Sequence, residues 1–185
     1  MCTKDRVDGL ILIKLVFISF IVFRGSFSMT EASSNLIPRS LFYSYAHEDE
    51  ELRIELNKHL SLLRNQGIIS DWNDRMILGG EEWEDEIDEN LEKADIILLL
   101  ISSSFNASDY CYKKEMARAL ERHKAGEAVV IPVILRDCDW HSAPYGKLQA
   151  LPKDGKSVTG SSWHSKDEAF TDVATGIRAV ASKKN

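Results

Sequence analysis

The chain has 185 residues, of which 44% are hydrophobic and 28% are charged, and its formal net charge is −6 at pH 7. This composition is sufficient for one globular domain with a full apolar core. The acidic balance argues against nonspecific nucleic-acid binding, because such binding requires a basic face that neutralises phosphates. We therefore expect no nucleic-acid partner.

The three cysteines, Cys2, Cys111 and Cys138, are widely spaced and odd in number. They form no CxxC pair, so a reduced compartment is the simplest fit and the domain is expected in the cytoplasm. A zinc site built from Cys111, Cys138, His123 and His141 would have spacings that match no zinc pattern. We expect neither a metal site nor a bound cofactor.

Residues 1–28 lie outside the predicted globular domain and allow three interpretations. Residues 10–23 are almost wholly apolar, and as a helix they would span about 21 Å, short of the ~30 Å hydrocarbon core of a bilayer. The segment is a membrane anchor, a signal peptide, or the result of a misassigned start, with translation beginning at Met29. Membrane contact is expected only through residues 10–23, and a linker follows over residues 29–40.

The predicted elements then alternate between strands and helices. A strand at residues 41–45 is followed by a polar turn and by a helix with leucines on one face that stops at Gly67. A second strand at residues 68–72 leads into a glycine-containing loop at residues 73–80. An acidic amphipathic helix is expected over residues 81–92, and its charges are interpreted as a solvated face.

The second half of the chain continues the alternation. A third strand, residues 95–101, is followed by a polar loop at residues 102–104 and by a helix that ends at Gly126. A fourth strand at residues 129–135 is apolar throughout, as expected for a strand covered on both faces. A loop-rich segment with a short last strand near residues 157–159 precedes a final amphipathic helix.

This alternation predicts a parallel sheet with helices on both faces. Right-handed crossovers place the loops at residues 44–49, 73–80 and 102–110 along one edge of that sheet. Glu115 follows the third strand, in the first turns of the next helix. Ligands of open α/β sheets bind at this edge, so Glu115 is the candidate chemical centre, provided that it faces a cleft. The alternative is that Glu115 is a solvated helix glutamate.

Several motifs stand in a fixed order along residues 41–182. Residues 42–49 read FYSYAHED, residues 71–83 read DWNDRMILGGEEW, and residues 108–111 read SDYC shortly before Glu115. These motifs resemble the first box, the second box with its BB loop, and the third strand and following helix of bacterial Toll/interleukin-receptor (TIR) domains.

The resemblance implies a flavodoxin-like α/β fold over residues 41–182, with a five-stranded parallel sheet in the order 2-1-3-4-5 and a tail at residues 183–185. It also implies one of two functions. The first is cleavage of NAD+ at the nicotinamide–ribose bond, activated by self-association, in defence or cell-death responses. The second is a non-catalytic interaction module that assembles with other TIR domains. A nucleoside deoxyribosyltransferase-like enzyme on a similar fold is a third interpretation, against which the box motifs count.

The same resemblance implies roles for individual residues. Glu115 occupies the position of the catalytic glutamate, whose carboxylate would stabilise an oxocarbenium-like sugar as the cationic nicotinamide leaves. The expected substrate-binding residues are Ser44, Tyr45, Ala46, Arg75, Gly79, Gly80, Trp83, Tyr110 and Cys111. Many family members have an aromatic residue four positions before the glutamate, where this chain has Cys111. Tyr45, Trp83 and Arg75 also fit structural roles, as core packing, a helix anchor and a surface charge.

Overall fold

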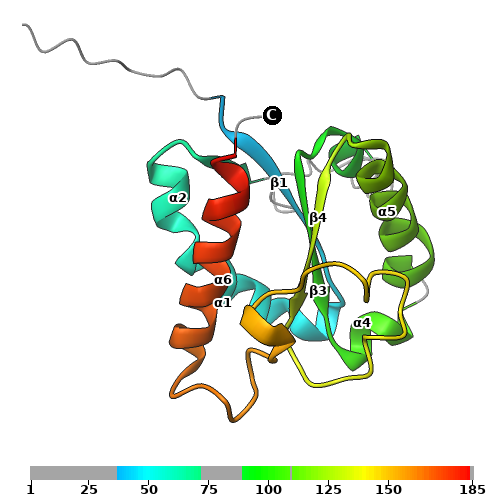
Figure 1. Ribbon diagram of the computed structural model, residues 1–185, viewed down its shortest axis with the longest axis vertical. Helices are drawn as coiled ribbons and strands as arrows, with labels where there is room; N and C mark the ends of the chain where they lie inside the picture. Colours follow the sequence, from blue (N-terminus) through cyan, green and yellow to red (C-terminus); the bar gives the residue numbers. More distant parts are fainter. Residues whose placement is uncertain (1–36, 72–88, 109, 184–185) are drawn as a thin grey trace, which may run out of the picture. The chain divides into compact units, whose positions relative to one another are not determined.

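A four-stranded parallel sheet forms the centre of the part of the chain that the computed structural model describes, residues 37–71, 89–108 and 110–183 (Figure 1). Its strands are, in chain order, β1 (Arg39–Ser44), β2 (Ile69–Asp71), β3 (Ile96–Ile101) and β4 (Val129–Ile134). They lie side by side in the order β2-β1-β3-β4, and each neighbouring pair is parallel. The predicted α/β fold and the order 2-1-3-4 of its first four strands are confirmed, whereas the sheet in the described residues has four strands and not the expected five.

The register of the sheet brings the strand ends to common edges. Ser44 at the end of β1 pairs with Leu99 of β3, and Ile101 at the end of β3 pairs with Ile134 at the end of β4. We call this side the carboxyl edge and the side where the strands begin the amino edge. Every residue of β3 is buried, because helices cover both faces of a central parallel strand.

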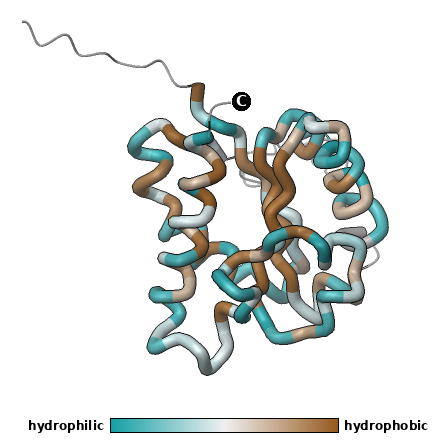
Figure 2. Tube along the Cα trace, in the orientation of Figure 1, coloured by the Kyte–Doolittle hydropathy of each residue, from teal (hydrophilic) through white to brown (hydrophobic). Residues whose placement is uncertain are grey.

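Helices pack on the two faces of the sheet (Figure 1). One face carries α1 (Glu50–His59), α2 (Ser61–Asn65) and α6 (Lys166–Ala181), and the other carries α4 (Ser103–Ala107) and α5 (Met116–Ala125). Side chains alternate along each strand, so Leu41 and Tyr43 join the core on the α1 and α6 face, and Phe42 joins the core on the α5 face. Figure 2 shows the apolar strands between helices of mixed polarity.

The ends of the helices follow from local sequence. Gly67, after α2, and Gly126, after α5, have φ angles of 65° and 77°, a region that glycine adopts without steric cost. The side chain of Ser165 caps α6 by accepting a hydrogen bond from the backbone N–H of Glu168 at 3.2 Å. The predicted stops at Gly67 and Gly126 are confirmed.

Two local predictions differ from the structure. The expected polar loop at residues 102–104 is instead the start of α4, because the hydroxyl of Ser102 caps this helix by accepting from the backbone N–H of Phe105 at 3.0 Å. The expected last strand near residues 157–159 is not a strand. Beside β4, within the described residues, Leu151 forms a single parallel bridge with Val133, and the Val158 N–H donates to the Ile134 carbonyl at 2.9 Å.

Several predicted segments fall outside the described residues. These are the apolar segment at 10–23, the loop at 73–80 and most of the acidic helix predicted for 81–92, of which residues 89–92 are described as helical. Across the described parts of the chain, no helix combines the length and apolar character needed to cross a bilayer.

Candidate active site

Glu115 lies at the carboxyl edge, at the end of the π-helical turn η3 (Tyr110–Glu115) and directly before α5. Only 5% of its surface is exposed, so its side chain does not extend into bulk water. The hydroxyl of Ser44, the last residue of β1, donates a hydrogen bond to Glu115 Oε2 at 2.5 Å. The candidate chemical centre is therefore a buried acid held by the end of the neighbouring strand.

The alternation of side chains along β1 explains why Ser44 reaches Glu115. Phe42 and Ala46 both belong to the apolar cluster on the α5 face of the sheet. Ser44, midway between them and fully buried, points to the same face. The structure thus brings Ser44 and Ala46, two of the predicted substrate-binding residues, to the side of the sheet that carries Glu115.

Tyr45 takes the opposite direction. It packs against the apolar cluster on the α1 and α6 face, and the guanidinium carbon of Arg53 lies 5.5 Å from the centroid of its ring. Arg53 in turn donates from Nε to Glu50 at 3.2 Å. The structure does not bring Tyr45 together with Glu115, and its placement matches the core-packing interpretation.

The π-helical turn η3 places Tyr110 and Cys111 in the turn that ends at Glu115. Single turns of this kind add a residue to the helical repeat and occur frequently at functional sites. The side chains of Tyr110 and Cys111 lie outside the described part of the structure. Their contacts with a substrate therefore stay predictions.

The remaining predicted site residues lie in the stretch at residues 72–88 that the structure does not describe. They are Arg75, Gly79, Gly80 and Trp83. Of the three loops expected at the carboxyl edge, those after β1 and β3 meet there, as the next contacts show, and the loop at 73–80 is left untested.

A second buried acid, Asp49, connects three strand ends at this edge. Asp49 closes the short helix η1 (His47–Asp49) after β1 and is fully buried. Its carboxylate accepts a hydrogen bond from the hydroxyl of Ser102, directly after β3. The Nε of Arg136, two residues after β4, donates to Asp49 Oδ1 at 2.7 Å. Charge-assisted bonds of this kind fix the relative positions of the segments that they join.

Asn106 of α4 holds the chain that follows β4. The Tyr145 hydroxyl donates to Asn106 Oδ1 at 2.6 Å, and Asn106 Nδ2 donates to the Asp139 carbonyl at 3.4 Å. Tyr145 is fully buried and packs edge-to-face with Phe105, with ring centroids 6.3 Å apart. The loop after β4 is thereby fixed beside the carboxyl edge.

Cys138 in this loop is a poor candidate for a nucleophile. Burial raises the pKa of its thiol above the ordinary value of 9.0, and the negative charges of Asp137, Asp139 and Asp49 raise the pKa further. A thiol with a raised pKa stays protonated at neutral pH, whereas the thiolate is the reactive form. Cys138 is therefore not a candidate nucleophile at this edge.

A cavity of 350 Å³ lies at the other edge of the sheet. It is lined by residues at the starts of β1 and β3, by the turn between α5 and β4, and by the end of α6, among them Arg39, Asp95, His123 and Lys183. It is not part of the site around Glu115. Across the described ranges, no three His, Cys, Asp or Glu side chains gather in a group that could hold a metal ion.

A family model described as "TIR domain" matches residues 41–171, well over half of the chain. The chain belongs to the TIR domain family. The matched range contains Ser44, Asp49 and Glu115 and all four strands from Leu41 onward. The resemblance found in the box motifs is confirmed, and at the carboxyl edge of this TIR domain two buried acids, Glu115 and Asp49, accept hydrogen bonds from serine hydroxyls.

One curated relative is protein y4lF of Sinorhizobium fredii (strain NBRC 101917 / NGR234). It is 55% identical over 144 residues, which make up 78% of this chain and 44% of the relative. The chain thus spans less than half the length of that relative.

Two solved structures are similar to the chain. The TIR domain of the Toll-related receptor TRR-2 from Hydra magnipapillata is 23% identical, with a TM-score of 0.44, over 54% of this chain and 73% of that one. The TIR domains of the activated Roq1 resistosome, which directly recognises the pathogen effector XopQ, are 22% identical, with a TM-score of 0.43, over 51% of this chain and 56% of that one.

The sequence reasoning missed the network around Asp49. The pattern of polar and apolar residues in the sequence places Asp49 in a polar turn that leads into a helix. The signal that could have revealed the network is a polar residue soon after each of three parallel strands, namely Asp49 after β1, Ser102 after β3 and Arg136 after β4. Since the ends of parallel strands share one edge, such residues come close together.

Proposed function

We propose that this TIR domain is an NAD+ glycohydrolase, activated by self-association, that acts in defence or cell-death signalling. The observation that carries the proposal is the buried carboxylate of Glu115, bonded to Ser44 at the carboxyl edge. Ligands of open parallel sheets bind at this edge. Burial of an acid costs folding free energy that a solvated helix glutamate would not cost, and such a cost is common where a residue serves function.

Cleavage of the nicotinamide–ribose bond requires little acid–base catalysis from the protein. The bond between ribose C1′ and the nicotinamide nitrogen breaks, and its electron pair leaves with the nitrogen, which neutralises the positive charge of the pyridinium ring. Positive charge develops on the sugar, and water adds to C1′ and loses a proton, giving ADP-ribose and nicotinamide. A carboxylate beside the sugar stabilises the oxocarbenium-like transition state. Glu115 supplies that carboxylate.

The neighbours of Glu115 position it for this role. The bond from Ser44 fixes Glu115 Oε2 relative to the end of β1. Asp49 ties the ends of β1, β3 and β4 together through Ser102 and Arg136, which restricts movement of the strand ends at the carboxyl edge. A carboxylate whose orientation is set before the substrate binds needs no reorganisation in the transition state.

The test is incubation of the purified full chain with NAD+ while released nicotinamide is measured, at low and at high protein concentration. We expect turnover per molecule to rise with concentration, and kcat to fall by roughly 10²–10³-fold in Glu115→Gln, because one preorganised electrostatic contact is removed. Glu121→Gln is the matched control, since Glu121 lies on α5, which begins directly after Glu115, and its side chain is 68% exposed. Unchanged turnover in Glu115→Gln would falsify the assignment.

The alternative is a non-catalytic TIR module that acts by assembly with other TIR domains. Family membership is compatible with this interaction module, and assembly does not require an acid at position 115. A sample that self-associates at high concentration and leaves NAD+ intact would support this alternative. The BB-loop residues that would mediate such contacts, at 73–80, lie outside the described residues.

A further inference from the structure

Two buried charged residues lie on one face of the helical stretch made by the end of η3 and α5, one at each edge of the sheet. Glu115, directly before α5, and Arg122, within it, are each 5% exposed, and Met116 and Ala119 between them are also buried. Seven residues of helix separate the two charges, a rise of about 10.5 Å. Glu115 contacts Ser44 at the carboxyl edge, and Arg122 lies at the amino edge.

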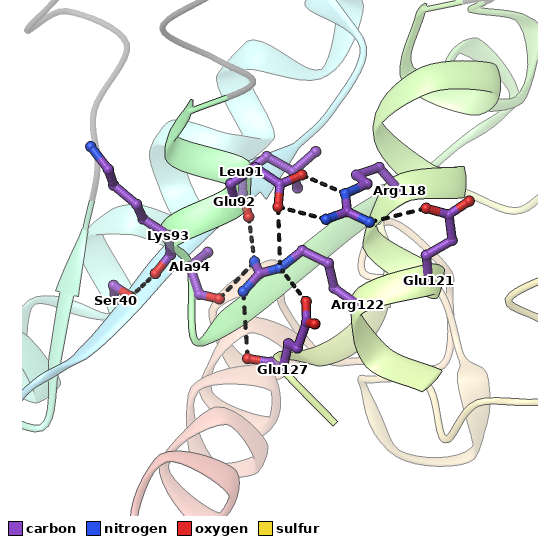
Figure 3. Close-up of polar contacts among 9 residues, drawn as sticks. All are labelled: Ser40, Leu91, Glu92, Lys93, Ala94, Arg118, Glu121, Arg122 and Glu127. Carbon is purple, nitrogen blue, oxygen red and sulfur yellow. Dashed lines mark hydrogen bonds and ion pairs between the residues drawn. The ribbon is translucent and has the colours of Figure 1, made fainter. Parts of the chain in front are cut away.

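Arg122 fixes the far end of α5 to the backbone before β3 (Figure 3). Its Nη1 donates to the carbonyls of Leu91 and Ala94, the latter at 3.0 Å. Its Nη2 donates to the carbonyl of Glu127 at 3.4 Å. Among the described residues, the buried Nε has no hydrogen-bond partner, and carboxylate oxygens of Glu127 and Glu92 lie 3.6 and 3.9 Å from it.

Arg118 provides a second connection, one turn closer to Glu115. Its Nε and Nη2 both donate to the carboxylate of Glu92, the second of these at 2.7 Å, while Nη1 donates to Glu121 at 3.1 Å (Figure 3). The hydrogen bond from Arg118 is the main reason why the pKa of Glu92 lies below its ordinary value. Two parallel bonds between a guanidinium and a carboxylate restrict both distance and angle.

Glu92 belongs to the short helical stretch at residues 89–93 that leads into β3. The Glu92–Arg118 pair therefore joins a segment that is continuous with the sheet to the helix that begins directly after Glu115. A shift of α5 along or about its axis changes the position of Glu115 relative to Ser44. Catalytic groups need placement within roughly 0.5 Å, and a misplacement of about 1 Å costs up to about 100-fold in rate.

We propose that Arg118 is a positioning residue: its bidentate contact with Glu92 determines the position of Glu115 relative to Ser44. The effect on the rate rests on the proposed glycohydrolase function, whereas the effect on the position of Glu115 does not. Arg118 does not touch the reacting atoms, and with 43% of its side chain exposed it contributes little to stability.

The test compares Arg118→Gln and Glu92→Gln with Glu121→Gln, which removes a contact made within α5 alone. We expect kcat for NAD+ to fall about tenfold in Arg118→Gln and Glu92→Gln, with KM unchanged and thermal stability only slightly lowered. The double variant should be no slower than either single variant, because both remove the same contact. Glu121→Gln should match the wild type.

The second measurement is the side-chain carboxyl ¹³C resonance of Glu115, identified by its loss in Glu115→Gln. Arg118→Gln removes a positive charge and Glu92→Gln a negative one, so a purely electrostatic effect would move this resonance in opposite directions. Positioning predicts a shift in the same direction in both variants and none in Glu121→Gln. Opposite shifts, or no shift, would overturn the inference even if the wild type cleaves NAD+. If the resonance shifts in the same direction in both variants but the protein leaves NAD+ intact, the positioning role is supported and the glycohydrolase function is ruled out.

Discussion

The two edges of the sheet handle negative charge in different ways. At the carboxyl edge, Glu115 and Asp49 are 5% and 0% exposed, so their hydrogen bonds and the Asp49 side of the Asp49–Arg136 pair lie away from solvent. At the amino edge, the side chains of Asp95 and Glu92 are 40% and 44% exposed, so their pairs with arginines are open to solvent. Exposed ion pairs contribute little to stability, whereas a buried acid depends strongly on its partners.

This difference matters for the proposed chemistry, which places the reaction at the carboxyl edge. The acids of the amino edge join segments together, and solvent reduces the cost of each charge. The acids of the carboxyl edge are removed from solvent, so their charges interact more strongly with nearby groups. A developing positive charge would be stabilised far more effectively there than at the amino edge.

The largest expected effect comes from breaking the Asp49 network. Asp49→Ala removes the acceptor of the Ser102 hydroxyl and the charge partner of Arg136, and we expect the free energy of unfolding to fall by about 3 kcal/mol. Asp95→Ala, at the amino edge, should cost about 1 kcal/mol because its site is open to water. Urea unfolding of both variants measures the difference. Equal losses would show that the two edges do not differ.

A smaller effect is expected from a matched pair of serines on β1. Ser44 donates to buried Glu115, and Ser40 donates to half-exposed Asp95 at 2.8 Å. We expect Ser44→Ala to lower the free energy of unfolding by about 2 kcal/mol, and Ser40→Ala by less than about 1 kcal/mol, because a charged acceptor that loses a donor in a buried site cannot be fully rehydrated. Thermal unfolding at neutral pH is the measurement, and a larger loss in Ser40→Ala would contradict the comparison.

The smallest effect concerns the pH dependence of the amino edge. The bond from Arg118 holds the pKa of Glu92 below 4.5, its ordinary value. A lowered carboxyl pKa contributes stability above the unfolded pKa, and this contribution is lost as the pH falls through the folded pKa. The Tm advantage of the wild type over Glu92→Gln should therefore be constant from neutral pH down to about 4.5 and shrink below it. An advantage that does not shrink as the pH falls from about 4.5 to about 3 would show that Glu92 does not titrate in this way.

The sequence predicts β3 and β4 because these two strands are almost wholly apolar. The apolar runs at residues 96–101 and 129–134 predict buried strands, and the glycines at 67 and 126 mark the helix ends. The pattern was less informative where side chains decide local structure. Ser102 looks like a loop residue until its hydroxyl is seen to cap α4, and the polar segment after β4 forms one bridge at Leu151 in place of a strand.

The candidate site could be predicted in part. The position of Glu115 follows from the order of elements, and its closeness to the end of β1 follows from the topology. The bond to Ser44 depends on the face to which Ser44 points, and that face is fixed by the register of β1. The Asp49 network joins residues 53 and 87 positions apart, and no local pattern reveals such a contact.

The alternation along β1 has a consequence for how this domain tolerates change in length. Phe42, Ser44 and Ala46 point to one side of the sheet and Tyr43 and Tyr45 to the other. Insertion or deletion of one residue before Ser44 would exchange the two sets and turn a tyrosine ring toward Glu115. Segments between the elements can lengthen without such an exchange, whereas β1 can change only by two residues at a time.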